Sequence, residues 1–269
     1  RSILRPAFPF QSEALSDLEK YQIFEDILKK EAISALKPLN MPFFYIKDCI
    51  FAISQLKREG ISPDDFKTIL DEEFSDGKFE GLKKTESQRK LLQKQKNYDL
   101  LQVYVEYQKN LKDRLRFDFD DMISLVVEAF KNNELLLREY QEKLHYFLVD
   151  EYQDTNSAQN AIVDLLASYW GDANVCVVGD PNQSIFRFQG ASIENSLSFV
   201  ETYRNAKIIT LDRGYRCSQL LYDASHSVIQ ENKLTQEERI HELHSAVSKK
   251  LVSETNPKGE PIKIASLPS

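Results

Sequence analysis

Three acidic side chains follow an apolar run in the segment LVDEYQDTN, residues 148–156. Asp150 and Glu151 are adjacent, and Asp154 comes three residues later. Adjacent carboxylates repel each other and lose solvation when they leave water, so a purely structural role is difficult to justify. At the end of a buried strand, Asp150 could hold Mg²⁺ while Glu151 takes a proton from an attacking water. The pattern favours nucleotide hydrolysis, although an isolated Asp-Glu pair is more often a solvated turn.

A second segment, VVGDPNQSIFRFQGA (177–191), adds to that signal. It offers Gly179 for a tight turn, followed by Asp180 and the amide of Gln183. Phe186 and Phe188 then bracket a cation, Arg187. Alternating aromatic and cationic side chains suit base stacking on a single strand of nucleic acid, while core packing is the alternative for the two aromatic rings.

The elements that would position these residues are short apolar strands. Runs rich in Val, Ile and aromatic residues occur at 144–151, 174–180, 207–212 and 261–267, separated by helical or mixed sequence. Such alternation predicts an α/β fold whose parallel sheet is covered on both faces. Ligands of these sheets bind beyond the carboxyl ends of the strands. We therefore expect the acids that end the first two strands to lie side by side.

The preceding hundred residues show helical periodicity instead. Ser16 is a plausible N-cap of a first helix, and a second amphipathic segment (43–60) ends at Gly60. Pro63 opens a third helix, and a fourth covers 86–115. In the basic stretch from Lys78 to Arg116 there are eleven Lys/Arg against five Asp/Glu. This stretch is either a phosphate-contacting face or a solvated helix surface.

Composition excludes several classes of protein. The net charge of −7 argues against a uniformly basic coat for nucleic acid but not against a local basic groove. Three scattered cysteines form neither a disulfide frame nor a zinc motif and favour a reducing, cytoplasmic location. No apolar run reaches the roughly 18 residues needed to cross a bilayer, so no membrane partner is expected. The sequence begins at Arg1 and ends at Ser269, which suggests a fragment of a larger protein.

Three segments resemble motifs II, III and IV of the UvrD/Rep/PcrA-type superfamily 1 DNA helicases: LVDEYQDTNSAQ, VVGDPNQSIFRFQGAS and ITLDRGYRCSQLLYDASHSVI. FDFDDMI (117–123) also resembles the segment that precedes motif II in that family. The resemblance implies an α/β fold with a partial RecA-like parallel sheet of the P-loop NTPase type and a mainly helical insertion. It divides the chain into a helical insertion (1–115), the C-terminal half of the first motor domain (116–206) and the start of the second (207–269).

The resemblance also implies roles in an ATP site. Asp150 would hold Mg²⁺ and Glu151 would be the catalytic base. Gln183 would contact the γ-phosphate and couple it to DNA. Tyr215 would stack on adenine, and Arg216 would reach the γ-phosphate, a contact that suits a forked and permanently charged guanidinium.

Contacts with single-stranded and duplex DNA are implied as well. Phe186 and Phe188 would stack on bases of the translocating strand. The basic stretch, if it is a phosphate-contacting face rather than a solvated one, would turn cations of the helical insertion toward duplex DNA: Lys83, Lys84, Arg89 and Lys90.

Several features depart from the family pattern. Phe188 stands where the family usually has Trp, Gln189 stands in place of Arg, and Gly214 stands in place of Asn. Phe188 can still stack, whereas Gln189 cannot make a charged phosphate contact. The phosphate-binding sequence G-x-x-x-x-G-K-[ST] is absent from the 269 residues. We therefore expect a piece of an ATP-dependent helicase that does not hydrolyse ATP alone.

Two alternatives remain open. The first is a non-catalytic DNA-binding or scaffold subunit derived from a helicase motor. The second is a metal-dependent nuclease using Asp150, Glu151 and Asp180, which would leave Tyr215 and Arg216 without a role.

Overall fold

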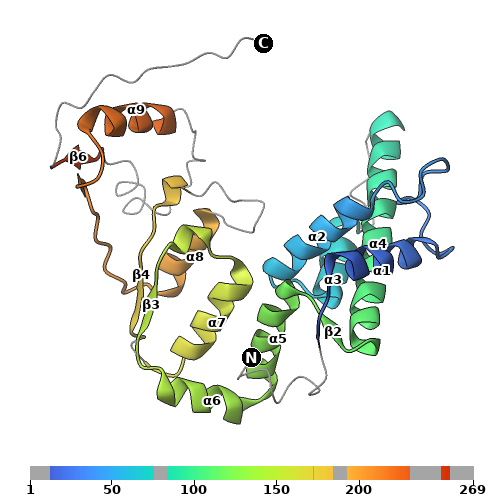
Figure 1. Cartoon of the computed structure of the whole chain (residues 1–269), viewed down its shortest axis with the longest axis horizontal. Helices are drawn as coiled ribbons and strands as arrows, with labels where there is room; N and C mark the ends of the chain where they lie inside the picture. The colour runs from blue at the N-terminus through green and yellow to red at the C-terminus, as the bar shows by residue number, and fades with distance from the viewer. Residues whose placement is uncertain (1–12, 76–83, 172, 184–192, 231–249, 255–269) are drawn as a thin grey trace.

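The computed structural model describes residues 13–75, 84–171, 173–183, 193–230 and 250–254. Figure 1 shows a helical part built from α1 to α4 and an α/β part in which α6, α7 and α8 lie near the strands β3 and β4, with α5 between the two parts. Across the described ranges, no helix combines the length and apolar character that crossing a membrane requires.

The helical part contains the helices predicted from periodicity. They are α1 (Asp17–Leu28), α2 (Ile46–Arg58), α3 (Pro63–Glu73) and α4 (Lys84–Asp113). Ser16 caps α1 in a capping box with Glu19, as its position in the sequence predicts. Apolar faces of α1, α2 and α4 meet in a core that includes Phe24, Ile53 and Tyr107.

The turn from α2 to α3 confirms two further sequence signals. Gly60 has a φ of +71°, a left-handed conformation that glycine adopts without a steric penalty. Ser62 then caps α3 in a capping box with Asp65, and Pro63 occupies the first helical turn.

The α/β part is organised around two parallel strands. β3 (Phe147–Val149) pairs with β4 (Val175–Val177), with Val149 opposite Val177. Each strand leads into a short 3₁₀ turn, η1 (Tyr152–Asp154) after β3 and η2 (Pro181–Gln183) after β4. The helices of this part are α5 (Phe119–Asn132), α6 (Glu134–Lys143), α7 (Ser157–Ala167) and α8 (Ile193–Thr202).

Helices cover one face of this two-stranded sheet. Phe147 packs against a core cluster formed by Val126, Phe130 and Leu166. On the opposite face Leu148 is 82% exposed, and Cys176, its partner in the register, is also exposed. The prediction of burial on both faces is therefore wrong for the described residues, because α5, α6 and α7 pack on a single side.

The third predicted strand, 207–212, is also wrong. These residues form no strand, and Ile209 and Leu211 are 72% and 75% exposed. A strand needs a neighbour for its backbone hydrogen bonds. Such pairing begins only at β5 (Arg213–Gly214), which runs parallel to β6 (Val252–Ser253) beside α9 (Gln219–Gln230). The fourth predicted strand, 261–267, lies outside the described residues.

The C-terminal end of α2 joins the helical part to the α/β part. Lys57 forms ion pairs with Asp118 and Asp121, at the start of α5. Arg58 pairs with Asp120 at 3.0 Å. A further connection comes from β1 (Glu13–Ala14), which pairs with β2 (Arg116–Phe117) just before α5. The last residues of α2 therefore fix the position of α5.

Candidate functional site

The ends of β3 and β4 remain paired beyond the strands themselves. The Val178 N–H donates to the Val149 carbonyl at 2.8 Å, and the Tyr152 N–H donates to the Val178 carbonyl at 2.9 Å. These bonds hold η1 against the end of β4. The acids that follow the two strands consequently lie at one edge of the sheet, which confirms the geometry expected from the sequence.

Asp150 and Glu151 are exposed at this edge. Glu151 has a φ of +50°, a left-handed conformation that is uncommon for residues other than glycine. The Asp150 Oδ1 accepts the Glu151 N–H at 2.9 Å, which supports the unusual backbone. Backbone conformations of this kind cost free energy and concentrate at functional sites, so the outlier favours a functional role for this turn.

Gln153 connects the two strand ends. Its side chain is among the largest fully buried ones, and the residue is 2% exposed. The Gln153 Nε2 donates to Glu151 Oε2 at 2.6 Å, and the Asp180 N–H donates to Gln153 Oε1 at 2.9 Å. One amide thus satisfies a carboxylate beyond β3 and a backbone group beyond β4.

The hydrogen bonds continue into η2. The Asp180 Oδ1 accepts the Asn182 N–H at 3.0 Å, and Asp180 Oδ2 accepts Gln183 Nε2 at 2.7 Å. Gln183, Asp180, Gln153 and Glu151 therefore form a continuous hydrogen-bonded series. The structure brings together Asp150, Glu151 and Gln183, three of the residues singled out in the sequence.

Gly179 makes this approach possible. A Cβ at this position would lie 2.6 Å from Gln153 Oε1 and 3.2 Å from the backbone nitrogens of Tyr152 and Gln153. Any larger residue would push against the bridging amide, which is buried and cannot swing away without losing its partners. The glycine serves a close approach here rather than a tight turn alone.

The oxygen atoms at this edge fit a magnesium ion. Across the described residues, no Lys or Arg side chain forms an ion pair with Asp150, Glu151 or Asp180, and Asp150 Oδ2 accepts no hydrogen bond. Mg²⁺ prefers oxygen ligands and is usually held by one or two carboxylates together with water and substrate phosphates. Among the described residues, no group of three or more Asp, Glu, His or Cys side chains could hold a metal ion by itself.

Tyr215 and Arg216 lie on a separate segment between β5 and α9. Both are exposed, and the hydrogen bonds around them hold the segment to β6, for example Ser253 Oγ donating to the Cys217 carbonyl at 2.8 Å. Gly214 precedes them, and a Cβ there would lie 2.1 Å from the Tyr222 hydroxyl oxygen. A side chain at position 214 would therefore require Tyr222 to move.

The expected DNA contacts are only partly described. Phe186, Phe188 and Lys83 lie outside the described residues, and the side chain of Lys84, the first residue of α4, is likewise not described. Arg89 and Lys90 are exposed on α4. Two cations further along the helix are engaged elsewhere, since Lys94 donates to the Phe74 carbonyl and Lys96 donates to the Tyr45 hydroxyl.

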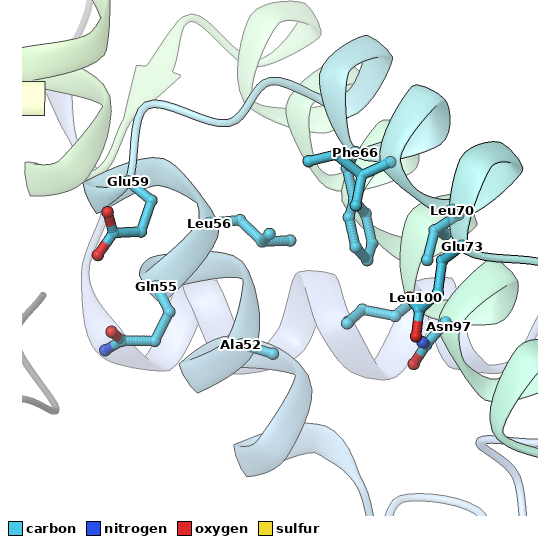
Figure 2. Close-up of a pocket in the computed structure, with 10 residues that line it drawn as sticks. Ala52, Gln55, Leu56, Glu59, Phe66, Leu70, Glu73, Asn97 and Leu100 are labelled. Carbon is cyan, nitrogen blue, oxygen red and sulfur yellow. The ribbon is translucent and has the colours of Figure 1, made fainter. Parts of the chain in front are cut away.

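A shallow hollow of about 300 Å³ lies between α2, α3 and α4 (Figure 2). Leu56, Phe66 and Leu70 supply much of its apolar lining, and Glu59 and Glu73 supply carboxylates. No Lys or Arg is among its lining residues. A phosphate or nucleic acid would therefore be repelled, and the hollow is separate from the strand ends that carry the acids.

Sequence reasoning missed the buried ion cluster between α2 and α5. Lys57 Nζ lies 2.8 Å from Asp118 Oδ2 and 2.6 Å from Asp121 Oδ1, and its side chain is 1% exposed. Burial alone would raise the pKa of Asp118, but the Lys57 and Lys20 ammonium groups outweigh it and lower that pKa. Burial raises the pKa of Asp121, and Lys57 offsets this only in part. No local pattern around Lys57 indicates this role.

The bridging glutamine was missed as well. Gln153 stands two residues after the acid pair, but its burial depends on the approach of Gly179 from the next strand. The sequence signal that could have indicated the bridge was a glycine, Gly179, after one strand and a glutamine, Gln153, after the other.

Comparison with known proteins identifies the family. Residues 11–204 match the family model described as the UvrD/REP helicase N-terminal domain. This match covers most of the chain and includes both strand ends. It also extends through the helical part.

Individual relatives agree with the family model. A Staphylococcus epidermidis protein named ATP-dependent DNA helicase PcrA is 35% identical over 214 residues, which are 80% of this chain and 25% of that protein. Bacillus subtilis and Leuconostoc citreum proteins of the same name are 45% and 44% identical over 130 and 131 residues, each covering 17% of the relative. The chain thus spans a quarter or less of the length of these relatives. On the strength of the family match, the chain belongs to the UvrD/REP family of superfamily 1 helicases.

Proposed function

We propose that this chain supplies the metal-binding and base side of the ATP site in a DNA helicase motor. Hydrolysis and movement along DNA would be activities of the complete polypeptide that contains this sequence. The observation that carries the proposal is the shared edge of β3 and β4, where Asp150, Glu151 and Gln183 are held by one series of hydrogen bonds.

Asp150 would bind the metal ion, and Glu151 would act as the base. When bound, Mg²⁺ would neutralise phosphate charge and polarise the phosphate under attack. Asp150 would hold the ion through Oδ2, the oxygen that accepts no hydrogen bond in the described residues. Glu151 would accept a proton from the attacking water at Oε1, because its Oε2 already accepts the Gln153 amide.

The remaining residues of the site complete the binding of nucleotide. Gln183 would contact the terminal phosphate from η2. Tyr215 would stack on the base, and Arg216 would bring a permanent positive charge to the phosphates. Both side chains are exposed on a segment held to β6, which supports their contact with a nucleotide bound between this segment and the strand ends.

The proposal assigns the rest of the chain by family pattern. Residues 1–115 would form the helical insertion, 116–206 the second half of a RecA-like motor domain of the P-loop type, and 207–269 the start of a second motor domain. Phe186 and Phe188 would stack on single-stranded DNA. Exposed cations of α4, including Arg89 and Lys90, would contact the duplex.

The proposal predicts the behaviour of Glu151→Gln in the complete polypeptide. This variant should bind MgATP with nearly unchanged affinity but release phosphate roughly 10²–10⁴ times more slowly in the presence of single-stranded DNA. Phosphate release and fluorescent nucleotide binding are measured on the same preparation. Phosphate release within a few-fold of the unmodified protein would remove Glu151 from the role of base.

The alternative of a non-catalytic DNA-binding subunit differs from the helicase motor in whether the complete polypeptide carries a G-x-x-x-x-G-K-[ST] sequence, which these 269 residues do not contain. Amide donors and the Lys of that loop provide much of the phosphate affinity in such sites. We therefore expect the 269-residue chain by itself to bind MgATP very weakly in calorimetry and to show no DNA-stimulated hydrolysis. Micromolar binding would mean that the chain forms a phosphate site of a different kind.

A further inference from the structure

The hydrogen-bonded series at the strand ends points to a second role for the edge of the sheet. Gln183 donates to the Asp180 carboxylate, the Asp180 backbone donates to Gln153, and Gln153 donates to the Glu151 carboxylate. We propose that Gln153 is a positioning residue that couples the position of Gln183 to that of the Glu151 carboxylate. The inference rests on the proposed function, because it concerns the same site.

The chemistry of the two partners requires an amide at position 153. The Asp180 N–H can only donate, so it fixes the Gln153 oxygen on its side. The ionised Glu151 carboxylate can only accept, so it fixes the Gln153 NH₂ group on the other side. A glutamate would lack the donor, and a methionine of similar length would lack both groups. The partners themselves therefore determine the orientation of the amide.

Burial makes this connection rigid. Gln153 is 2% exposed, so water does not readily replace either hydrogen bond. A buried polar group that loses its partner loses stability, which disfavours any movement that breaks one bond and leaves the other. The Tyr152 N–H, bonded to the Val178 carbonyl, keeps the backbone on either side of the bridge in register.

The position of the bridge gives it a function beyond stability. Gln183 is the residue that would contact the terminal phosphate, and Glu151 is the residue that would activate water. A shift of η2 on phosphate contact moves the Asp180 backbone, which is bonded to the bridging amide. The Glu151 carboxylate then moves with it, so base placement depends on the presence of the phosphate.

Two substitutions at Gln153 distinguish its hydrogen bond to the Asp180 N–H from its hydrogen bond to Glu151. Gln153→Met removes the hydrogen bonds to Glu151 and to the Asp180 N–H, whereas Gln153→Glu keeps the acceptor for the Asp180 N–H and sets a carboxylate against Glu151. Gly179→Ala disturbs the bridge from the other strand, since its Cβ would fall 2.6 Å from Gln153 Oε1. Gln141→Met is the matched control, because Gln141 is also a buried amide and donates to the Leu165 carbonyl at 2.7 Å, away from the site.

The measurements are steady-state ATP hydrolysis with single-stranded DNA and hydrogen exchange at the Asp180 amide, both in the complete polypeptide. We expect kcat to fall roughly 10- to 100-fold in all three bridge variants, with KM for ATP changed by less than about threefold. Exchange at Asp180 should become about tenfold faster in Gln153→Met but stay slow in Gln153→Glu. Gln141→Met should keep both kcat and the Asp180 protection.

Two outcomes would overturn the proposal. If Asp180 exchange is unchanged in Gln153→Met, the bridging bond does not hold the backbone. If exchange accelerates but kcat stays within twofold in both Gln153 variants, the bridge is structural only. Failure of the proposed function is a separate result, because Glu151→Gln would then retain turnover while the Asp180 amide still reports the bridge.

Discussion

Two groups of carboxylates in this chain have opposite surroundings. At the start of α5, Asp118 and Asp121 are buried and share the ammonium group of Lys57. At the ends of β3 and β4, Asp150 and Glu151 are exposed, and among the residues described there no cation pairs with them. The first group has its counter-charge within the fold, whereas the described partners of the second group are amide donors.

The difference separates acids that are paired within the fold from acids that we propose bind a ligand. Buried charges remain only when they are paired, and removing one partner is costly. Exposed acids that lie side by side repel each other and gain nothing for stability from their arrangement. The exposed strand-end acids are the arrangement that the proposed magnesium site would require.

Breaking the first group should have the largest effect on stability. Replacing Lys57 by Met removes the cation bonded to Asp121 and leaves Asp118 with the more distant Lys20, so the free energy of unfolding should fall by roughly 3–5 kcal/mol. Lys30→Met is the control, because Lys30 pairs with Glu106 at the surface and such pairs contribute about 1 kcal/mol or less. Urea titrations of the 269-residue chain measure both. If both variants lose a similar free energy of unfolding, the buried ion cluster contributes no more to stability than a surface ion pair.

Acid should remove the contribution that Asp118 makes to this cluster. The pKa of Asp118 is lowered in the folded chain, mainly because Lys57 and Lys20 outweigh its burial. The unfolded chain takes up this proton first, near pH 4, so the stability from Asp118 is present above that pH and is lost progressively below it. Asp118→Asn should therefore be less stable at neutral pH and should show a shallower decline from about pH 4 downward. Parallel slopes for the two proteins in urea titrations across this range would contradict this assignment.

The smallest effect on stability is expected from the exposed cations of α4. Replacing Arg89 and Lys90 by Glu should change the free energy of unfolding by no more than about 0.5 kcal/mol, because both are exposed. The variant should nevertheless bind duplex DNA more weakly and with a flatter salt dependence. The control carries the same charge change on α6, at Arg138 and Lys143. If duplex DNA affinity depends on salt equally in the two variants, the α4 cations form a solvated surface and do not contact phosphate.

Local features of the fold were predictable because their causes lie within a few residues. The caps of α1 and α3 require only Ser16 and Ser62 with an acid three positions later. Gly60 follows the end of α2 because glycine, lacking a Cβ, adopts the left-handed conformation found there. The meeting of the two strand ends was predictable too, since it follows from parallel pairing of neighbouring strands.

Features set by distant residues were not predictable. Lys57 meets Asp118 across 61 positions, and no periodicity in either segment encodes that contact. The run at 207–212 has the composition of a strand but lacks a described neighbour, so composition alone misled. At the site, the acids were evident from their types, whereas the Gln153 bridge depends on a glycine in another strand-end segment.

The most direct test of the contrast between the two groups compares the neutralisation of each in the 269-residue chain without added metal. Asp150→Asn with Glu151→Gln should leave the free energy of unfolding unchanged within about 0.5 kcal/mol, or raise it slightly as repulsion is relieved. Asp118→Asn with Asp121→Asn should lower it by roughly 3–5 kcal/mol, because Lys57 is left buried without a counter-charge. A loss of stability at the strand ends as large as that at α5 would show that Asp150 and Glu151 serve the fold, and would contradict their assignment to a ligand.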